Sequence, residues 1–516
     1  MQSKIWSAAL VGVDARLVEV ECDVAFGVPA FDTVGLAELA VREARVRVRS
    51  ALKQSGIMLP NKRVTVNLAP ADLRKDGTSF DLPVALALLE ADGKLPVGCL
   101  QGFLVVGELS LSGALRPVCG VLAVAELARQ LGLRGVLCPT DNMAEARAVG
   151  ELQVLGADTL GEVIARLKAQ DSWPNPPTEA LGDTGPRQFL CWSDVRGHDQ
   201  AKRALEVAAA GGHNAVLSGA PGTGKTMLAR RLPTILPPLT DREAIEVTKI
   251  HSVAGLLPSR SGLLRTRPFR APHHTASAAS LVGGGSVPRP GEVSLAHRGV
   301  LFLDELAEFP RQVLECLRQP LEDGHVVVTR ARQTVSFPAR SLMVAALNPC
   351  ACGHFGNGDG RCVCTPMQLE RYQSRLSGPL LDRIDVQLRL PSLPGELLRH
   401  GPSGDTSETV RLRVVAARLR QSERFASCDL GGAVPTNAEV SMAVLRKTSP
   451  LEPAVHDMLI RALDAYGLSP RAHDRVWRVA RTIADLDGAE QIGAAQLAEA
   501  LQYRWFDRRP QLQMAA

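Results

Sequence analysis

The chain has 516 residues, of which 45% are hydrophobic and 22% are charged, and its formal net charge is +5. This length exceeds what one core can hold, so two to four domains are expected. The small net charge excludes a basic field over the whole molecule, so a nucleic-acid-binding surface would have to be local. With three tyrosines and five tryptophans, base stacking is not expected as the main binding mode.

No window of the sequence holds the ~18 apolar residues that a membrane span needs. The first residues lack the basic and apolar regions of a signal peptide. We therefore expect a cytoplasmic protein with no membrane partner. Its eleven cysteines are then not expected to form a disulfide framework.

Residues 1–170 alternate strand-like runs, such as 64–68 and 103–106, with helical runs at 41–52 and 122–131. This alternation predicts an α/β domain. Residues 171–187 are rich in proline and polar residues and are typical of a linker.

Residues 188–394 begin with a predicted helix near 200–210 and continue with apolar strands at 215–217, 299–303, 342–347 and 384–390. Helices separated by such strands predict a doubly wound parallel sheet. Residues 395–516 show mostly helical periodicity and predict a C-terminal helical domain.

A phosphate-binding P-loop joins the strand at 215–217 to the helix that follows it. Its glycines allow backbone N–H groups to surround phosphates, its lysine reaches the terminal phosphates, and its threonine offers a hydroxyl to Mg²⁺. An ordinary glycine-rich turn would not combine all these residues between a strand and a helix. The predicted nucleotide-binding residues are Gly219, Pro221, Gly222, Thr223, Gly224, Lys225, Thr226 and Met227.

The strand at 299–303 ends in Asp304 and Glu305. We expect it to lie beside the P-loop strand, with Asp304 holding Mg²⁺ together with Thr226 and with Glu305 activating the attacking water. The alternative is an acidic helix cap after a buried strand. The strand at 342–347 ends in Asn348, an amide suited to position water beside the γ-phosphate, although an Asn there is also a common turn residue.

Arg383 comes just before the last strand of this region. Its guanidinium could reach the phosphates bound by a neighbouring subunit and act as an arginine finger, which can raise turnover ~10³-fold or more. From spacing alone, a solvated or ion-paired arginine is equally expected.

The order of P-loop, Asp-Glu strand, Asn strand and Leu-Leu-Asp-Arg resembles the AAA+ ATPases related to magnesium chelatase. Residues 267–275, 283–292, 471–475 and 480–486 resemble the YifB/ComM family in particular. This resemblance implies that Arg383 is the finger and that Arg471, on the helical lid, is a second sensor of ATP. It also implies hexameric rings with ATP between subunits, and ATP-driven DNA branch migration in natural transformation.

Two segments between the P-loop and Asn348 are candidates for DNA contact. The predicted strands 325–329 and 333–337 form a hairpin with Arg330 and Arg332 at its tip, and a basic glycine- and proline-rich loop carries His273 and His274. Arginines there could grip phosphates without reading bases, from single-stranded or branched DNA. The alternative is that some of the arginines in these two segments bind nucleotide or stabilise subunit contacts.

Four cysteines form two Cys-X-Cys pairs separated by nine residues: Cys350, Cys352, Cys362 and Cys364. Four thiolates could hold a tetrahedral structural Zn²⁺, although the spacing within each pair is tighter than usual.

The first domain resembles the Lon protease domain at residues 75–83 and 106–120. By this resemblance Ser79 takes the place of the nucleophile, but Val124 stands where the partner lysine belongs. A serine without a general base is a poor nucleophile, so we expect no proteolysis, and Ser79 is then a capping or turn residue.

The sequence therefore favours an ATPase (a DNA helicase or translocase) that uses ATP and Mg²⁺, forms homo-oligomers and works beside a recombinase. One alternative is a magnesium-chelatase-type motor that remodels a partner enzyme, by analogy of fold. Another is an ATP-dependent protease or unfoldase, which Val124 disfavours.

Overall fold

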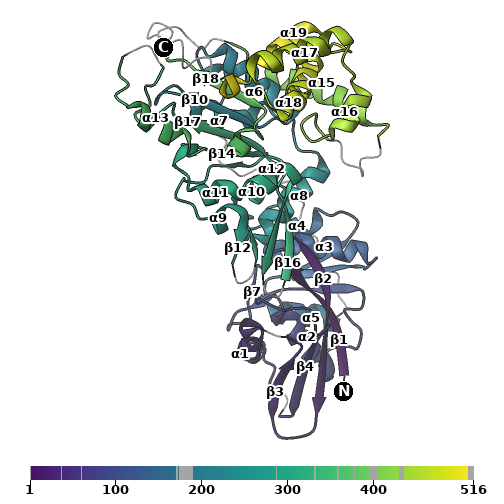
Figure 1. The fold of residues 1–516 in the computed structure, drawn as a ribbon. Coiled ribbons are helices and arrows are strands. Elements are labelled where there is room, and N and C mark those ends of the chain that lie inside the picture. The colour runs from purple at the N-terminus through teal and green to yellow at the C-terminus, as the bar shows by residue number, and fades with distance from the viewer. Residues whose placement is uncertain are drawn as a thin grey trace.

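The computed structural model describes residues 2–36, 38–59, 61–169, 173, 190–285, 288–330, 333–356, 360–376, 378–393, 404–428 and 435–508. One sheet organises residues 2–169, a second organises residues 190–393, and helices dominate residues 404–508 (Figure 1). The mixed α/β prediction is confirmed. The predicted domain boundaries, and the linker at 171–187 apart from residue 173, lie outside the described residues.

The first part is built on a seven-stranded sheet of order β3-β4-β2-β1-β5-β8-β9, with β1 and β2 antiparallel and β5, β8 and β9 parallel. Its strands are β1 (Gln2–Val11), β2 (Asp14–Ala25), β3 (Ala30–Val34), β4 (Arg63–Ala69), β5 (Phe103–Val105), β8 (Gly135–Pro139) and β9 (Gln153–Ala157). A small hairpin joins β6 (Glu108–Leu109) to β7 (Leu115–Arg116). Its helices are α1 (Leu39–Gln54), α2 (Asp81–Ala91), α3 (Val121–Gln130), α4 (Met143–Arg147) and α5 (Leu160–Ala169). Every residue of α2 is buried, including Asp81, whose carboxylate pairs with Arg47.

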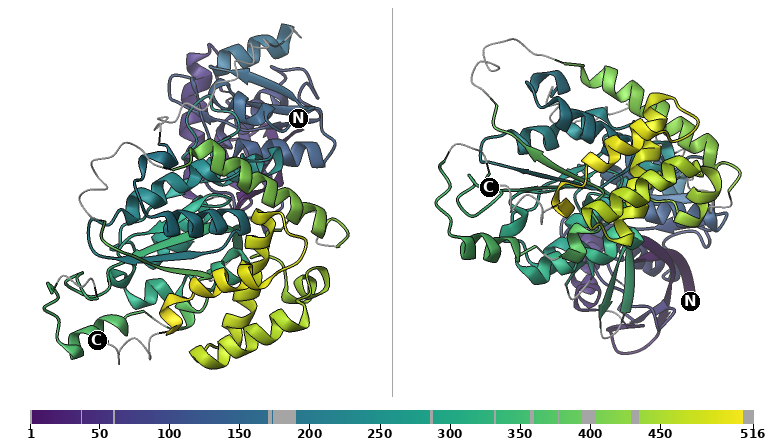
Figure 2. Two further views of the ribbon diagram at one scale, coloured as in Figure 1. Left: turned by 90° about the horizontal axis from the view of Figure 1, so that it is seen from above. Right: turned by 45° about the horizontal axis from the view of Figure 1, so that its top comes forward.

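The second part is a five-stranded sheet of order β11-β14-β17-β10-β18 in which all neighbours are parallel. Its strands are β10 (Ala215–Gly219), β11 (Phe269–Arg270), β14 (Val300–Leu303), β17 (Leu342–Leu347) and β18 (Val386–Leu390). Successive residues belong to different clusters, with Leu301 and Val216 in one core and Phe302 and Leu217 in another. Helices therefore cover both faces, as the left view of Figure 2 shows, and the near-continuous apolar strands are explained.

The helices of this part are α6 (Asp199–Gly211), α7 (Lys225–Ile235), α8 (Asp241–Val253), α9 (Ala278–Val282), α10 (Glu292–Leu295), α11 (Arg311–Glu315), α12 (Arg318–Asp323), α13 (Pro366–Gln373) and α14 (Gly378–Leu381). Two hairpins extend from the sheet, one of β12 (Gly283–Gly284) and β13 (Arg289–Pro290), the other of β15 (His325–Arg330) and β16 (Gln333–Pro338). The predicted hairpin around 325–337 is thus present.

The strand order corrects one expectation. The Asp-Glu strand β14 does not lie beside the P-loop strand β10, because the Asn strand β17 pairs with both and separates them. Chain order gives no hint of this insertion, since β17 follows β14 in sequence but lies nearer the P-loop.

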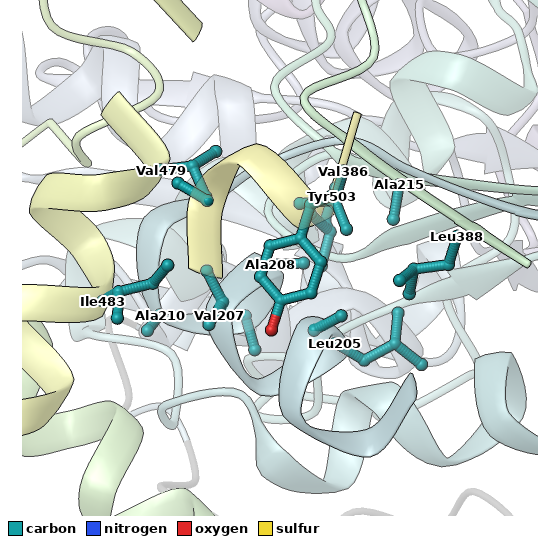
Figure 3. Packing of buried hydrophobic residues seen from close by; sticks show 14 of the residues in the cluster. Leu205, Val207, Ala208, Ala210, Ala215, Val386, Leu388, Val479, Ile483 and Tyr503 are labelled. Carbon is teal, nitrogen blue, oxygen red and sulfur yellow. The ribbon is translucent and has the colours of Figure 1, made fainter. Parts of the chain in front are cut away.

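The C-terminal part contains α15 (Ser407–Phe425), α16 (Met442–Thr448), α17 (Pro453–Tyr466), α18 (Pro470–Asp487) and α19 (Ala494–Gln502). Val479 and Ile483 of α18 and Tyr503, just after α19, pack near Val207 of α6 and Val386 of β18 (Figure 3). The lid helices therefore share a core with the second part.

A buried charge cluster lies at the same junction. The strand predicted at 384–390 begins at Val386, and the preceding Asp385 is buried instead of facing solvent. Its carboxylate accepts hydrogen bonds from Arg475 of α18 and from His213 Nδ1, the latter at 3.0 Å. Burial alone would raise the pKa of Asp385, but these two partners hold it well below its usual range.

The first two parts contact each other through α8. Lys249 Nζ lies 2.5 Å from Glu126 Oε2 and 2.7 Å from Asp14 Oδ1. Ser252 Oγ donates to Glu145 Oε2 at 2.6 Å. No helix in the described part of the chain is long and apolar enough to cross a membrane.

Candidate active site

The P-loop lies between β10, whose five residues are all buried, and the start of α7. Gly222 and Gly224 have φ of 79° and 83°, a left-handed conformation that glycine adopts without steric cost, so the chain can turn sharply there. Lys225 Nζ donates to Gly219 O at 2.6 Å and to Asn348 Oδ1 at 3.2 Å. Burial lowers the pKa of Lys225, while Asp304 and Glu305 act in the opposite direction.

The remaining predicted P-loop residues lie as follows. Thr223 is buried and its Oγ1 donates to Ala220 O at 2.8 Å, whereas Pro221 is exposed and Met227 is 38% exposed. Exposure of one side of the loop leaves its backbone accessible for phosphates.

Two oxygen ligands suited to magnesium lie together. Thr226 Oγ1 donates to Asp304 Oδ2 at 2.8 Å, which joins the start of α7 to the end of β14 across the intervening β17. A hydroxyl and a carboxylate at this position, beside the lysine, fit the coordination that Mg²⁺ prefers next to phosphates. These residues would hold the ion, which neutralises phosphate charge during transfer.

Glu305 has a φ of 52°, which is uncommon for a residue with a side chain. Its backbone N–H donates to Asp304 Oδ1 at 3.0 Å, and its half-exposed carboxylate lies 3.3 Å from His274 Nδ1. A non-glycine residue held in this conformation beside another acid, here Asp304, is a feature of functional sites.

The two histidines predicted to contact DNA line the same pocket as Asp304 and Glu305. This pocket of about 270 Å³ is lined by Thr226, Arg230, Ala271, Pro272, His273, His274, Phe302, Asp304 and Glu305. The rings of His273 and His274 lie 4.1 Å apart, centroid to centroid. The sequence pattern placed both histidines on a DNA-contacting loop and did not indicate the pocket, because the pairing of β11 with β14 is set by the fold.

Most of the arginines in residues 260–298 form ion pairs within the chain. Five of the six form ion pairs with carboxylates: Arg260 with Asp141, Arg265 with Asp241, Arg267 with Glu243, Arg270 with Glu292, and Arg298 with Glu246. These partners satisfy much of the positive charge, so the segment is not an open basic surface.

Neither the predicted arginine finger, Arg383, nor the predicted second sensor, Arg471, is among the residues that line the pocket. Arg383 Nη1 donates to Pro379 O at 2.6 Å, and its Nη2 lies 2.5 Å from Glu322 Oε1. Arg471, at the start of α18, is 63% exposed and 4.0 Å from Asp382. For the hairpin, Arg330 ends β15 opposite Gln333, its side chain is not described, and Arg332 lies outside the described residues.

The four predicted metal-binding cysteines are brought together. Their sulfur atoms all lie within 4.8 Å of one another, and Cys350 is fully buried. Hydrogen bonds lower the pKa of Cys352 to about 6, with the largest contribution from the backbone of His354. They therefore favour its thiolate. The cluster could therefore hold a metal ion.

Ser79 and Val124 lie in the first part. The backbone carbonyl of Ser79 accepts a hydrogen bond from Gly107 N at 2.9 Å in the turn before α2. Val124 is buried within α3.

Family comparisons cover most of the chain. Models described as "Subunit ChlI of Mg-chelatase", "Magnesium chelatase, subunit ChlI" and "Magnesium chelatase, subunit ChlI C-terminal" match residues 20–142, 191–398 and 404–504. The chain is 45% identical to competence protein ComM of Haemophilus influenzae over 506 residues, which is 97% of each chain. It is 43% identical over 507 residues to the uncharacterized protein YifB of Salmonella typhimurium, covering 98% of this chain and 97% of YifB.

A weaker match is to Lon protease 2 of Bacillus subtilis, with 24% identity over 160 residues, 30% of this chain and 28% of that protein. It agrees with the Lon-like motifs but carries no activity to this chain.

Proposed function

Because the chain belongs to the family of magnesium-chelatase-like proteins that includes ComM and YifB, we propose that it is a ring ATPase that drives branch migration of DNA. The family implies ATP hydrolysis with Mg²⁺. In our proposal Asp304 and Thr226 hold the ion, Glu305 activates water, Asn348 orients it, and Lys225 binds the terminal phosphates.

The remaining proposed residues are two arginines that act between subunits and four cysteines that bind a structural metal. Arg383 acts as the finger on the next subunit's nucleotide, and Arg471 senses ATP. Neither arginine lines the phosphate pocket of its own chain, so each would act on nucleotide bound by a neighbouring subunit, and Arg383 would have to leave its ion pair with Glu322 to do so. The four cysteines bind one structural Zn²⁺, since four thiolates complete a tetrahedral site.

The observation that carries the DNA role is the place of the β15–β16 hairpin. It is inserted in the chain between Glu305 and Asn348, with His325 at its base 20 residues after Glu305 and Pro338 10 residues before Asn348. Arg330 and Arg332 at the tip would contact phosphates in a manner independent of sequence. ComM is named a competence protein, which supports a role in natural transformation. In our proposal the protein works in the cytoplasm beside a recombinase.

The test combines ATP hydrolysis, with and without branched DNA, with strand displacement on a forked substrate. We expect DNA to stimulate hydrolysis, and the double variant Arg330→Ala with Arg332→Ala to lose both stimulation and displacement. The salt dependence of DNA binding should weaken by about one counterion for each phosphate contact removed. A charge-matched control is Arg411→Ala with Arg461→Ala, which removes two exposed arginines of α15 and α17 and should behave as the wild type.

The runner-up is a motor subunit that remodels a porphyrin-metallating enzyme, as the chelatase family models suggest. It is favoured if DNA leaves hydrolysis unchanged while such an enzyme stimulates it.

A further inference from the structure

The cysteine-bearing segment, described at residues 350–356 and 360–364, begins two residues after Asn348 and ends two residues before α13. We call it the cysteine knuckle. Cys350 Sγ lies 3.3 Å from Cys352 Sγ and 3.9 Å from Cys362 Sγ, and Cys352 Sγ lies 3.7 Å from Cys362 Sγ. A tetrahedral Zn²⁺ with bonds of about 2.3 Å requires sulfur atoms about 3.8 Å apart. The described geometry is therefore close to that of a four-thiolate site.

Apolar burial contributes little to the stability of the knuckle. Cys350 is buried, but Phe355 is 37% exposed and Val363 is 82% exposed. All four cysteines are free thiols, so no covalent link closes the loop. A bound metal would therefore supply most of the folding free energy of this segment.

The knuckle lies directly on the P-loop. Gly353 has a φ of 83°, and a Cβ at that position would come within 2.5 Å of Pro221 Cδ. On its other side, Gly356 O accepts a hydrogen bond from Arg389 of β18, the strand next to the P-loop strand. The knuckle thus contacts the P-loop and the strand beside it.

The knuckle also connects two groups with proposed catalytic roles. Asn348, which accepts from Lys225, lies on its N-terminal side. On its C-terminal side, the hydroxyl of Thr365 caps α13, whose Tyr372 is buried in the core, and the chain then continues to α14 and Arg383. A change in the knuckle would therefore act on Asn348 through the chain and on Pro221 through direct contact.

We infer that the metal held by the cysteine knuckle positions the P-loop and Asn348 for hydrolysis, so that its removal inactivates the ATPase while the rest of the chain stays folded. The four cysteines are positioning residues in this inference, because none of them lines the phosphate pocket. The inference depends on the proposed nucleotide site, but not on DNA binding.

The test uses the full chain without DNA. The zinc content, the melting temperature, and the kcat and KM for ATP are measured for the wild type and for Cys362→Ser with Cys364→Ser. A displacement of catalytic groups by about 1 Å can cost about 100-fold in rate, so we expect kcat to fall about tenfold or more. We expect the wild type to hold one zinc ion per chain and the variant none, with a smaller change in KM and a similar melting temperature.

The matched control is Cys316→Ser with Cys428→Ser, which changes two half-buried cysteines outside the knuckle and should keep zinc and kcat. If the knuckle variant does not fold, zinc is stripped from the wild type with a reversible mercurial and chelator, and then restored. We expect kcat to fall and to recover with Zn²⁺. Full kcat in protein that holds no metal, or loss of metal without loss of kcat, would overturn the inference. A wild type with no ATPase at all would instead refute the proposed function.

Discussion

Arg475→Ala is the change for which the structure gives the clearest magnitude. Arg475 extends from α18 to the buried carboxylate of Asp385, which also accepts from His213. Removing the guanidinium breaks the ion pair and leaves the buried Asp385 carboxylate with the hydrogen bond from His213. Breaking a buried pair from one side costs about 3–5 kcal/mol. A unit of 150–250 residues loses about 2–4 °C of melting temperature per kcal/mol, so we expect a decrease of about 6 °C or more.

The same helix offers the control. Arg471 lies four residues earlier, is 63% exposed and stands 4.0 Å from Asp382. An exposed pair of this kind contributes about 0–1 kcal/mol, so Arg471→Ala should lower the melting temperature by a few degrees at most. If both variants melt alike, the buried pair does not hold the lid to the sheet and the reasoning is wrong.

The pH dependence gives a second measurement. The pKa of Asp385 is held well below its usual range, so its ionised form stabilises the fold. This contribution is complete above the unfolded pKa, about 3.9, and is lost as pH falls through the lower folded value. Without Arg475, the buried Asp385 carboxyl binds a proton more readily. In acid this protonation removes the unpaired buried charge, so the destabilisation of the variant becomes smaller. The difference in melting temperature should therefore narrow from pH 7 towards pH 4, and a difference that widens would contradict this account.

Three further predictions concern hydrolysis. Glu305→Gln should bind ATP normally but lower kcat by about 100-fold or more, because general-base catalysis is lost. Steady-state hydrolysis and nucleotide retention measure the two effects, and unchanged turnover would show that Glu305 does not activate water. His274→Ala should lower kcat about tenfold with KM nearly unchanged, since the imidazole 3.3 Å from the carboxylate orients it; a rise in kcat would mean that His274 instead holds Glu305 inactive. Arg383→Ala should lower kcat ~10³-fold, and mixing it with Lys225→Ala should restore part of the hydrolysis, because one variant keeps the P-loop and the other the finger; no recovery in mixtures would argue against action between subunits.

The P-loop could be predicted from the sequence because its chemistry is local. The left-handed turns at Gly222 and Gly224 and the positions of Lys225 and Thr226 are set by neighbouring residues along the chain. The same holds for Cys350 to Cys364, where short spacing brings the thiols together.

The position of β14 in the sheet could not be predicted in this way. The apolar pattern identifies a buried strand, but two buried parallel strands look alike in sequence, and the order in the sheet depends on which crossover places β17 between β10 and β14. The Thr226–Asp304 contact nevertheless forms, because all the strands present their carboxyl ends at one edge.

The arginines near residue 270 show a different limit. The sequence of this segment is basic, but Arg260 pairs with Asp141, 119 residues away in the chain, and Arg265 pairs with Asp241, 24 residues away. Such pairs are visible only in the fold. A basic segment of sequence is therefore weak evidence for a nucleic-acid surface, because its arginines can form ion pairs with distant acids.

The contacts of residues 2–169 with the ATPase part indicate a structural role for them. Gly12, in the turn between β1 and β2, has no room for a Cβ, which would come within 2.5 Å of Val335 Cγ1 in the hairpin. The neighbouring Val13 belongs to the same apolar cluster as Val335. Lys249 of α8 fixes the same turn through Asp14. The first domain is thus attached both to the body of the ATPase part and to the hairpin, so we expect it to limit how far the hairpin can move between nucleotide states.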